Sequence, residues 1–398
     1  MAIDLTETPK IKYQEIDSNP TPSGDGAEIP VIIGITNNAT PATGVLRFRN
    51  YTAAARSVAN GGIGVEADIA TNPLLQFLKD FFKENVKKEA DDLVVPYVYV
   101  IDLGTGKTSD QTPVLNASAW TSAFASAKIK RDATAEVLVG FKKTDTAAAI
   151  IPILDSALDK IKTDAVKGSP RVLYYSVDGM SMTELAALTD TNSTTTNNGN
   201  TVNLYIQDSR LALIGLYNEF GITCARIFTT HYSEEPGYGE YRSVSANTFV
   251  ERTDTEEDTI QNNGIIFNHD EKPGKSIHPK INLAVSTSFA KNSDNRPNDC
   301  LLHARRNVDQ LIRDVFETLY PQLKRNETEV NLSYCQADVD TLINDKKEKG
   351  YMMDGTYVDV KESTSNPFDL EAEGVAVPVN ATELIRFSMY IEAPNTTI

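Results

Sequence analysis

The stretch Ile29-Pro-Val-Ile-Ile-Gly-Ile-Thr36 is a short apolar run that stops at turn-forming residues. A run of this length without polar alternation is typical of a strand buried on both faces, as in a parallel sheet. We interpret Ala135 to Gly140, Arg171 to Val177 and Leu93 to Ile101 as further strands of the same sheet. Gly44 to Arg49 alternates between apolar and polar residues, which predicts a half-buried strand.

Helical patterns separate these runs. Asn72 and Pro73 suit the cap and first position of a helix whose apolar stripe runs from Leu74 to Phe82. Residues 146–166 form a second amphipathic pattern, and we expect a short helix over 208–220 and a strand over 223–229. Alternation of strands and helices predicts a mostly parallel, mixed sheet flanked by helices.

The last third of the chain has a different pattern. Residues 300–320 and 333–349 are amphipathic, with Ser333 and Gln336 as a possible capping box and Gly350 as the carboxyl-terminal cap of the second helix. Residues 351–360, 374–379 and 383–392 then read as strands. This pattern predicts an α+β unit that ends on an alternating strand.

The predicted fold class is therefore α/β followed by α+β. We expect an extended amino-terminal arm over 1–28, which is polar and rich in proline and glycine. An α/β region follows over 29–290, with exposed loops near 104–130 and 190–203. An α+β domain over 291–380 and a carboxyl-terminal strand or arm over 381–398 complete the chain.

Composition excludes several classes of function. The 398 residues carry a formal net charge of -17, which disfavours binding to nucleic acid or to an anionic membrane surface. We find no apolar run long enough to span a membrane and no signal-peptide pattern at the start. Cys224, Cys300 and Cys335 are widely spaced, so we expect neither a disulfide framework nor a zinc site.

Catalytic signals are weak. Gly104 to Thr108 resembles part of a phosphate-binding loop, but Ile101 stands where that motif needs a glycine. His269, Asp270, Glu271 and His278 match no metal-ligand spacing, and we interpret them as a solvated loop. We therefore predict no catalytic, cofactor-binding or metal site. Arg305, Arg306 and Arg313 lie on the polar side of the helix over 300–320, either as a solvated mixed-charge face or as a docking surface.

The order of segments is similar to that of contractile tail sheath proteins of phages, injection systems and R-type bacteriocins. Thr8 to Ile16 resembles the family's opening segment, with Lys10 where the family usually has glycine. Ile29 to Thr36 resembles its first core strand, and Asn262 to Phe267 resembles its turn around Gly264. The closing pattern, from Leu342 to Glu392, matches best. The tryptophan usual in that region is absent, and so is the usual glycine pair between the aromatic helix and its following strand.

This resemblance implies a structural subunit that polymerises as stacked rings around an inner tube and contracts to drive the tube through a target envelope, which is genome ejection in a phage. It implies that the two terminal arms exchange strands with other copies. The residues expected in this exchange are Ile11, Tyr13, Ile16, Ile385, Phe387, Met389 and Ile391. It also implies that Arg305, Arg306 and Arg313 face the tube.

The implied partners are copies of the chain itself, an inner tail tube protein, and baseplate and tail terminator proteins. Nucleic acid and membrane insertion are not expected. The implied location is a virion tail or contractile particle assembled in the host cytoplasm. Two alternatives stay open: an α/β nucleotide- or sugar-acting enzyme that uses Gly104 to Thr108, and a phage fibre or adhesion protein suggested by the Thr/Asn-rich stretch 190–203.

Overall fold

The structure is a computed structural model. It describes residues 27–87, 92–105, 117–127, 130, 132–140, 147–177, 194–197, 200–203, 206–215, 220–238, 241–243, 253–269, 280–290, 300–321, 332–362 and 370–378.

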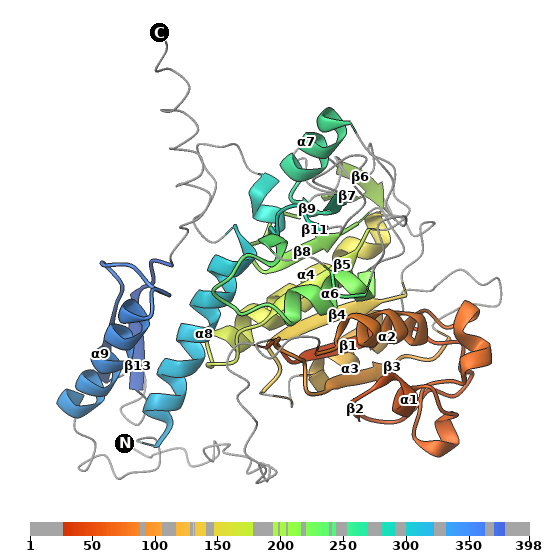
Figure 1. The fold of residues 1–398 in the computed structure, drawn as a ribbon, viewed down its shortest axis with the longest axis horizontal. Coiled ribbons are helices and arrows are strands. Elements are labelled where there is room, and N and C mark those ends of the chain that lie inside the picture. The colour runs from red at the N-terminus through yellow and green to blue at the C-terminus, as the bar shows by residue number, and fades with distance from the viewer. Residues whose placement is uncertain are drawn as a thin grey trace.

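A seven-stranded sheet forms the centre of the molecule (Figure 1). Its strands are β1 (Pro30–Gly34), β2 (Leu46–Phe48), β3 (Val98–Asp102), β4 (Ala135–Val139), β5 (Val172–Ser176), β8 (Leu211–Ile214) and β9 (Ile265–Ile266). Their order is β2-β3-β1-β4-β5-β8-β9, and each neighbouring pair is parallel except β2 with β3. The predicted mostly parallel sheet is confirmed, and β1 is buried along its whole length.

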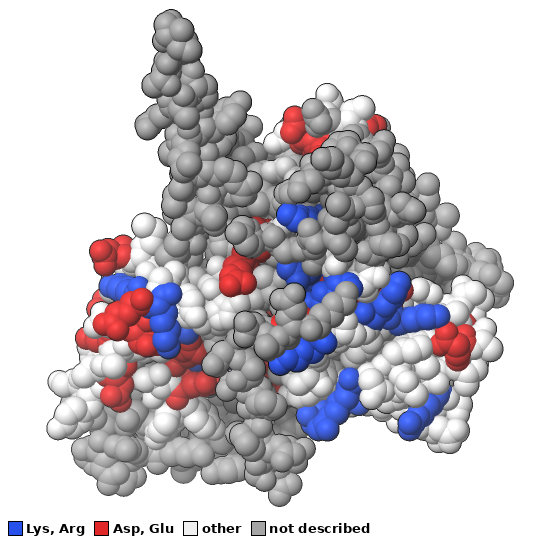
Figure 2. Space-filling model, viewed as in Figure 1, with Lys and Arg blue, Asp and Glu red and all other residues white. Residues whose placement is uncertain are grey.

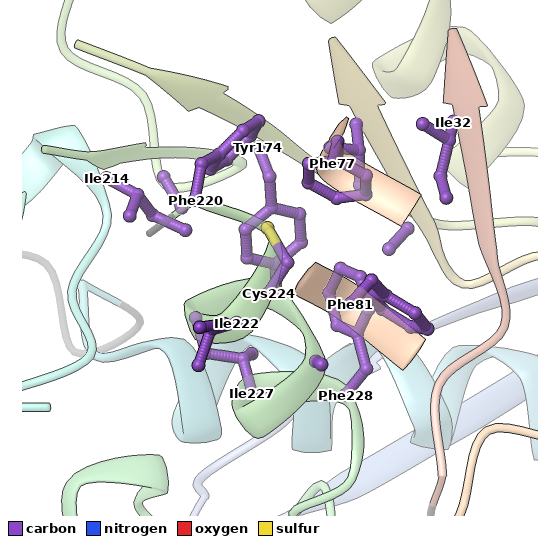
Figure 3. Packing of buried hydrophobic residues seen from close by; sticks show 14 of the residues in the cluster. Ile32, Phe77, Phe81, Tyr174, Ile214, Phe220, Ile222, Cys224, Ile227 and Phe228 are labelled. Carbon is purple, nitrogen blue, oxygen red and sulfur yellow. The ribbon is translucent and has the colours of Figure 1, made fainter. Parts of the chain in front are cut away.

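Helices cover both faces of this sheet. One face carries α1 (Tyr51–Ala54), α2 (Pro73–Glu84) and α6 (Phe220–Phe228), and the other carries α3 (Ala117–Ala127), α4 (Ala147–Ala165) and α7 (Asp254–Asn262). Alternate residues of each strand enter the two cores: Ile32 packs on the α2 side, whereas Val31 and Ile33 pack on the α4 side. Figure 3 shows the first core, where rings of α2 and α6 meet Tyr174 of β5.

The start of α2 confirms the predicted cap. The Asn72 side-chain oxygen accepts a hydrogen bond from the Leu75 amide at 2.9 Å, and Pro73 is the first helical residue. The Asn72 amide group also donates to the Ile63 carbonyl at 2.9 Å. Asn72 therefore fixes both the helix and the loop that precedes it.

Two predicted elements are wrong in type. Residues 208–220 were expected to be helical, but Leu211–Ile214 is strand β8, between β5 and β9. Residues 223–229 were expected to be a strand, but 223–228 lie in helix α6. Every residue of α6 except Arg226 is buried, so this helix has almost no polar face whose period could reveal it.

Parts of the two expected exposed loops form a helix and a pair of strands. Residues 117–127, inside the first, form α3, and its Trp120 and Phe124 are buried in the second core. Alanine and serine fill most of its other positions, which hides the apolar stripe. The second loop contains a hairpin of β6 (Thr194–Asn197) and β7 (Asn200–Asn203). A further short pair joins β10 (Asn268–His269) to β11 (Lys280–Ile281).

The carboxyl-terminal part consists of α8 (Leu302–Leu319), α9 (Leu332–Glu348) and an antiparallel pair, β12 (Tyr357–Glu362) with β13 (Leu370–Val375). These elements enclose a separate small core, whose buried members are Leu311, Val315, Leu319, Cys335, Val339, Ile343 and Met352. Leu302 at the start of α8 belongs instead to the first core of the sheet. Helix α8 therefore connects the first core of the sheet to this small core.

No helix in these ranges combines the length and the apolar character that crossing a bilayer requires.

Candidate assembly surface

The arginines of α8 lie at the amino ends of the parallel strands. Arg306 donates from Nε to Glu28 Oε1 at 2.9 Å, just before β1, and from NH2 to the Thr230 carbonyl at 2.6 Å. Arg313 donates from NH2 to the carbonyls of Ala133, at 2.9 Å, and Pro170, just before β4 and β5. These contacts attach α8 to one edge of the sheet.

Asp309 pairs with two further arginines beside these contacts, and we call this group, with Glu28, Arg306 and Arg313, the charged layer. It accepts from Arg305 Nε at 3.0 Å and from Arg305 NH2 at 2.6 Å on its own helix. Its other oxygen accepts from Arg210 NH1 at 2.7 Å, and Arg210 directly precedes β8. Burial lowers the pKa of Arg313 to about 10, although Asp309 opposes the effect.

The prediction that all three arginines lie on a polar side of this helix is therefore wrong for Arg305 and Arg306. Only 9% of Arg305 and 2% of Arg306 is exposed, and their charges are used within the chain. The partners of Arg306 could not be found from the local sequence, since Glu28 is 278 positions away. That Arg305, Arg306 and Arg313 face an inner tube stays a prediction; in this fold they hold α8 against the sheet.

Glu28 lies two residues before strand β1, near the start of the described residues. Its amide donates to the Phe228 carbonyl at 3.0 Å, and its carboxylate is buried beside Arg306. Burial raises the pKa of Glu28 above its ordinary value, and Arg306 opposes that shift without cancelling it.

A second contact connects α9 to α8. Lys346 of α9 lies 2.5 Å from Asp314 Oδ2 and donates to the Tyr232 hydroxyl at 3.2 Å. Burial disfavours the ammonium, but the hydrogen bond and charge of Asp314 outweigh burial, so the pKa of Lys346 is raised.

The hairpin of β12 and β13 has two different edges. The outer edge of β12 is bonded by Gln336 of α9: its Nε2 donates to the Val358 carbonyl at 2.8 Å, and its Oε1 accepts from the Val360 amide at 2.8 Å. Gln336 thus binds a neighbouring strand, and the helix starts at Leu332, so Ser333 lies inside its first turn. Among the described residues, no strand pairs with the outer edge of β13.

Side chains on β13 are mostly exposed, and 45% of Val375 is accessible to solvent, as is 51% of Tyr357 opposite it. Gly374 allows the two strands to approach closely, because a Cβ atom there would lie 2.0 Å from the Tyr357 carbonyl oxygen. An unpaired edge with exposed apolar residues is a template for another strand. This edge is the best candidate for an assembly site.

The residues expected to exchange strands lie outside the described residues. These are Ile11, Tyr13, Ile16, Ile385, Phe387, Met389 and Ile391. The domain boundaries expected at 291 and 381 likewise fall in undescribed segments.

The phosphate-loop resemblance gains no support from the described residues. Gly104 donates its amide to Asp102 Oδ1 at 2.8 Å, and Asp102 also bonds Thr36 at 2.7 Å and the Ala42 amide at 3.0 Å. The carboxylate thus occupies the Gly104 amide, one of the donors that a phosphate loop would use, while residues 106–108 are not described. Within the described ranges, no cluster of His, Cys, Asp and Glu could hold a metal ion. His278 and residues 270–271 lie outside them.

Several solved structures that are similar to this chain are sheath proteins. The chain is similar to the helical sheath of the anti-feeding prophage in its contracted state, with a TM-score of 0.57 and 10% identity over 94% of this chain and 98% of that one. It has the fold of a contractile tail sheath protein.

Other sheath structures agree. The sheath tail protein of Desulfitobacterium hafniense gives a TM-score of 0.57 at 9% identity, covering 93% of this chain and 97% of that one. The sheath of the PVC extracellular contractile injection system, also contracted, gives 0.54 at 10%, covering 95% and 96%. No protein-family model matches the sequence of this sheath-fold chain, and no curated protein matches it. The predicted sheath resemblance is thus confirmed at the level of fold, over almost the whole chain.

Proposed function

We propose that this chain is a structural subunit of a contractile tail sheath and that it has no catalytic role. It would polymerise as stacked rings around an inner tube, and contraction of the polymer would drive the tube through a target envelope. The observation that carries the proposal is the sheath fold over 94% of the chain, together with an edge of β13 that no described strand pairs with.

The β13 edge supports assembly by strand addition. Each strand of the hairpin has six residues, and Gln336 occupies the β12 edge, so an incoming strand has one place to pair. The alternating segments around Ile11 to Ile16 and Ile385 to Ile391 are the candidate donors from neighbouring copies. Main-chain hydrogen bonds would supply affinity, while alternate side chains would set the register.

The charged layer under the sheet supports force transmission. Buried ion pairs join α8 to the starts of β1 and β8, and hydrogen bonds from Arg313 join it to the carbonyls just before β4 and β5. Lys346 joins α9 to α8. Such pairs hold one geometry because breaking them leaves buried charge without a partner. We therefore infer that the sheet with its helices and the small carboxyl-terminal core move together as one body when the lattice contracts.

The proposed partners are an inner tail tube protein, a baseplate and a tail terminator, with the particle assembled in the host cytoplasm as a virion tail or a similar contractile device. A solved baseplate of the anti-feeding prophage contains a chain similar to this one at a TM-score of 0.57 and 11% identity, which supports the baseplate partner.

Electron microscopy of the purified full-length protein tests the proposal. We expect ordered hollow tubes or stacked rings, and we expect their loss when residues 1–26 and 379–398 are both removed. A compact monomer at all concentrations, or polymers that form equally well without the two terminal segments, would contradict the proposal.

A further inference from the structure

Lysine and arginine side chains gather over α2 and α6, on one face of a chain whose net charge is -17 (Figure 2). Lys79, Lys83 and Lys87 are exposed along α2 and just beyond its end. Arg226 of α6 and Arg242 lie next to them, since Arg242 NH1 donates to the carbonyl of Val86 at 2.9 Å. We call these five basic residues the basic face.

Arg226 is the unusual member of this face. Its Nε is buried without a hydrogen-bond partner, and no ion pair among the described residues involves its guanidinium. The nearby carboxylate of Glu84 is already bonded to the amides of Arg242 and Ser243, each at 2.8 Å. Burial and the positive charge of Arg242 lower the pKa of Arg226. A buried Nε–H with no hydrogen-bond partner among the described residues is costly, and a carboxylate from a second copy would offset that cost.

The opposite charge gathers on α9. Tyr334, Asp338, Thr341, Asp345 and Glu348 are spaced three or four positions apart, so they share one side of the helix, which we call the acidic face. Of these, Tyr334 is 70% exposed, and an exposed aromatic ring beside charged groups is typical of an interface anchor. Figure 2 shows Asp and Glu side chains, interleaved with basic ones, over this part of the molecule, and Lys349 pairs with Asp345 at 2.8 Å.

The two faces lie at different ends of the molecule, with α9 at one end and α2 toward the other (Figure 1). A single chain therefore cannot bring them together. Because the two surfaces are unlike, contact between copies would be head-to-tail, and a contact of this type can propagate as a helical filament.

We propose that the basic face of one copy binds the acidic face of a second copy. This inference rests on the proposed function and adds to it a specific lateral contact, distinct from strand addition at β13. Charge complementarity across such a contact would set which surfaces meet and would speed their encounter.

Reciprocal charge reversal tests the contact. The basic-face variant is K83E/K87E and the acidic-face variant is D338K/E348K; all four residues are exposed. The matched control for the acidic-face variant is D155K/D159K, which makes the same charge change of about +4 on exposed positions of α4. Assembly is followed by light scattering and electron microscopy, and circular dichroism verifies that each variant is folded.

We expect each face variant alone to need about tenfold more protein to assemble, which corresponds to two surface charge pairs. An equimolar mixture of the two variants should assemble at the wild-type concentration, because each reversed face then meets a complementary one. The α4 control should match the wild-type protein.

Face variants that assemble like the wild type, or a mixture that recovers nothing, would overturn the inference while leaving the sheath proposal intact. A basic-face variant that assembles normally but no longer binds the tube protein would assign that face to the tube instead, and would also overturn it. Failure of the wild-type protein to form any polymer would contradict the sheath proposal itself.

Discussion

Replacing Arg306 with methionine should strongly destabilise the fold, because it breaks the buried pair that attaches α8 to the start of β1. The two side chains are 1% and 8% exposed, and the Nε to Oε1 distance is 2.9 Å. Methionine would fill much of the same space but would leave the Glu28 carboxylate without its partner. The Thr230 carbonyl would also lose the hydrogen bond that Arg306 donates at 2.6 Å.

The expected cost follows from these contacts. Removing one partner of a buried ion pair costs about 3–5 kcal/mol. Glu28 can limit that cost by binding a proton, since burial already raises its pKa. We therefore expect a loss of about 3 kcal/mol in the free energy of unfolding near neutral pH.

The pH dependence has a definite sign. A carboxyl whose folded pKa lies above its unfolded value of 4.5 contributes stability at low pH, and this contribution is lost as pH rises toward the folded pKa. Loss of Arg306 raises the folded pKa of Glu28 further. The deficit of R306M should consequently be smaller at pH 5 than at pH 8.

Urea unfolding of the full-length chain, at concentrations below assembly, measures these quantities. R306M combined with E28L should recover part of the loss, because neither charge then stays buried alone. The exposed substitution K167M serves as the control and should be nearly neutral. A deficit of R306M below about 1 kcal/mol, or one independent of pH, would refute the role assigned to this pair.

Three further predictions concern the carboxyl-terminal elements. Q336L removes two hydrogen bonds to β12 and should cost about 1–3 kcal/mol in urea unfolding, and its exposed β12 edge should increase non-specific aggregation in light scattering. G374V places a side chain 2.0 Å from the Tyr357 carbonyl oxygen, so hydrogen exchange across the hairpin should accelerate and tubes should fail to form. The pKa of Lys346 is raised, so the stability that its ion pair with Asp314 contributes is fully present below pH 10.5. This stability is lost as the pH rises through the raised pKa of the folded protein, and alkaline unfolding curves of K346M should not show that loss.

Apolar runs were sufficient to predict much of the sheet, and a cap signal was sufficient to predict the start of α2. The run over 29–36 became the buried strand β1, and Asn72 with Pro73 began α2, because both signals depend on neighbouring residues alone. Helix α6 could not be recognised in this way. Packing buries it on nearly all sides, so β-branched and aromatic residues fill positions where an ordinary surface helix shows polar ones.

The candidate assembly surface was less predictable, because long-range contacts define it. Gln336 was interpreted as part of a helix cap, but its amide bonds the backbone of β12, more than twenty positions later. The arginines of α8 were expected on a polar side of the helix, but Arg306 is buried against Glu28 and the Thr230 carbonyl, both far away in the sequence. A local pattern identifies which residues are polar but not which distant group will pair with them.

The outer edge of β13 offers the most direct test of assembly by strand addition. A reconstruction of the assembled polymer by electron cryo-microscopy should show a strand from another copy paired along Leu370–Val375, with the β12 edge still bonded by Gln336. A polymer in which β13 has no intermolecular strand beside it would contradict the proposed mode of assembly.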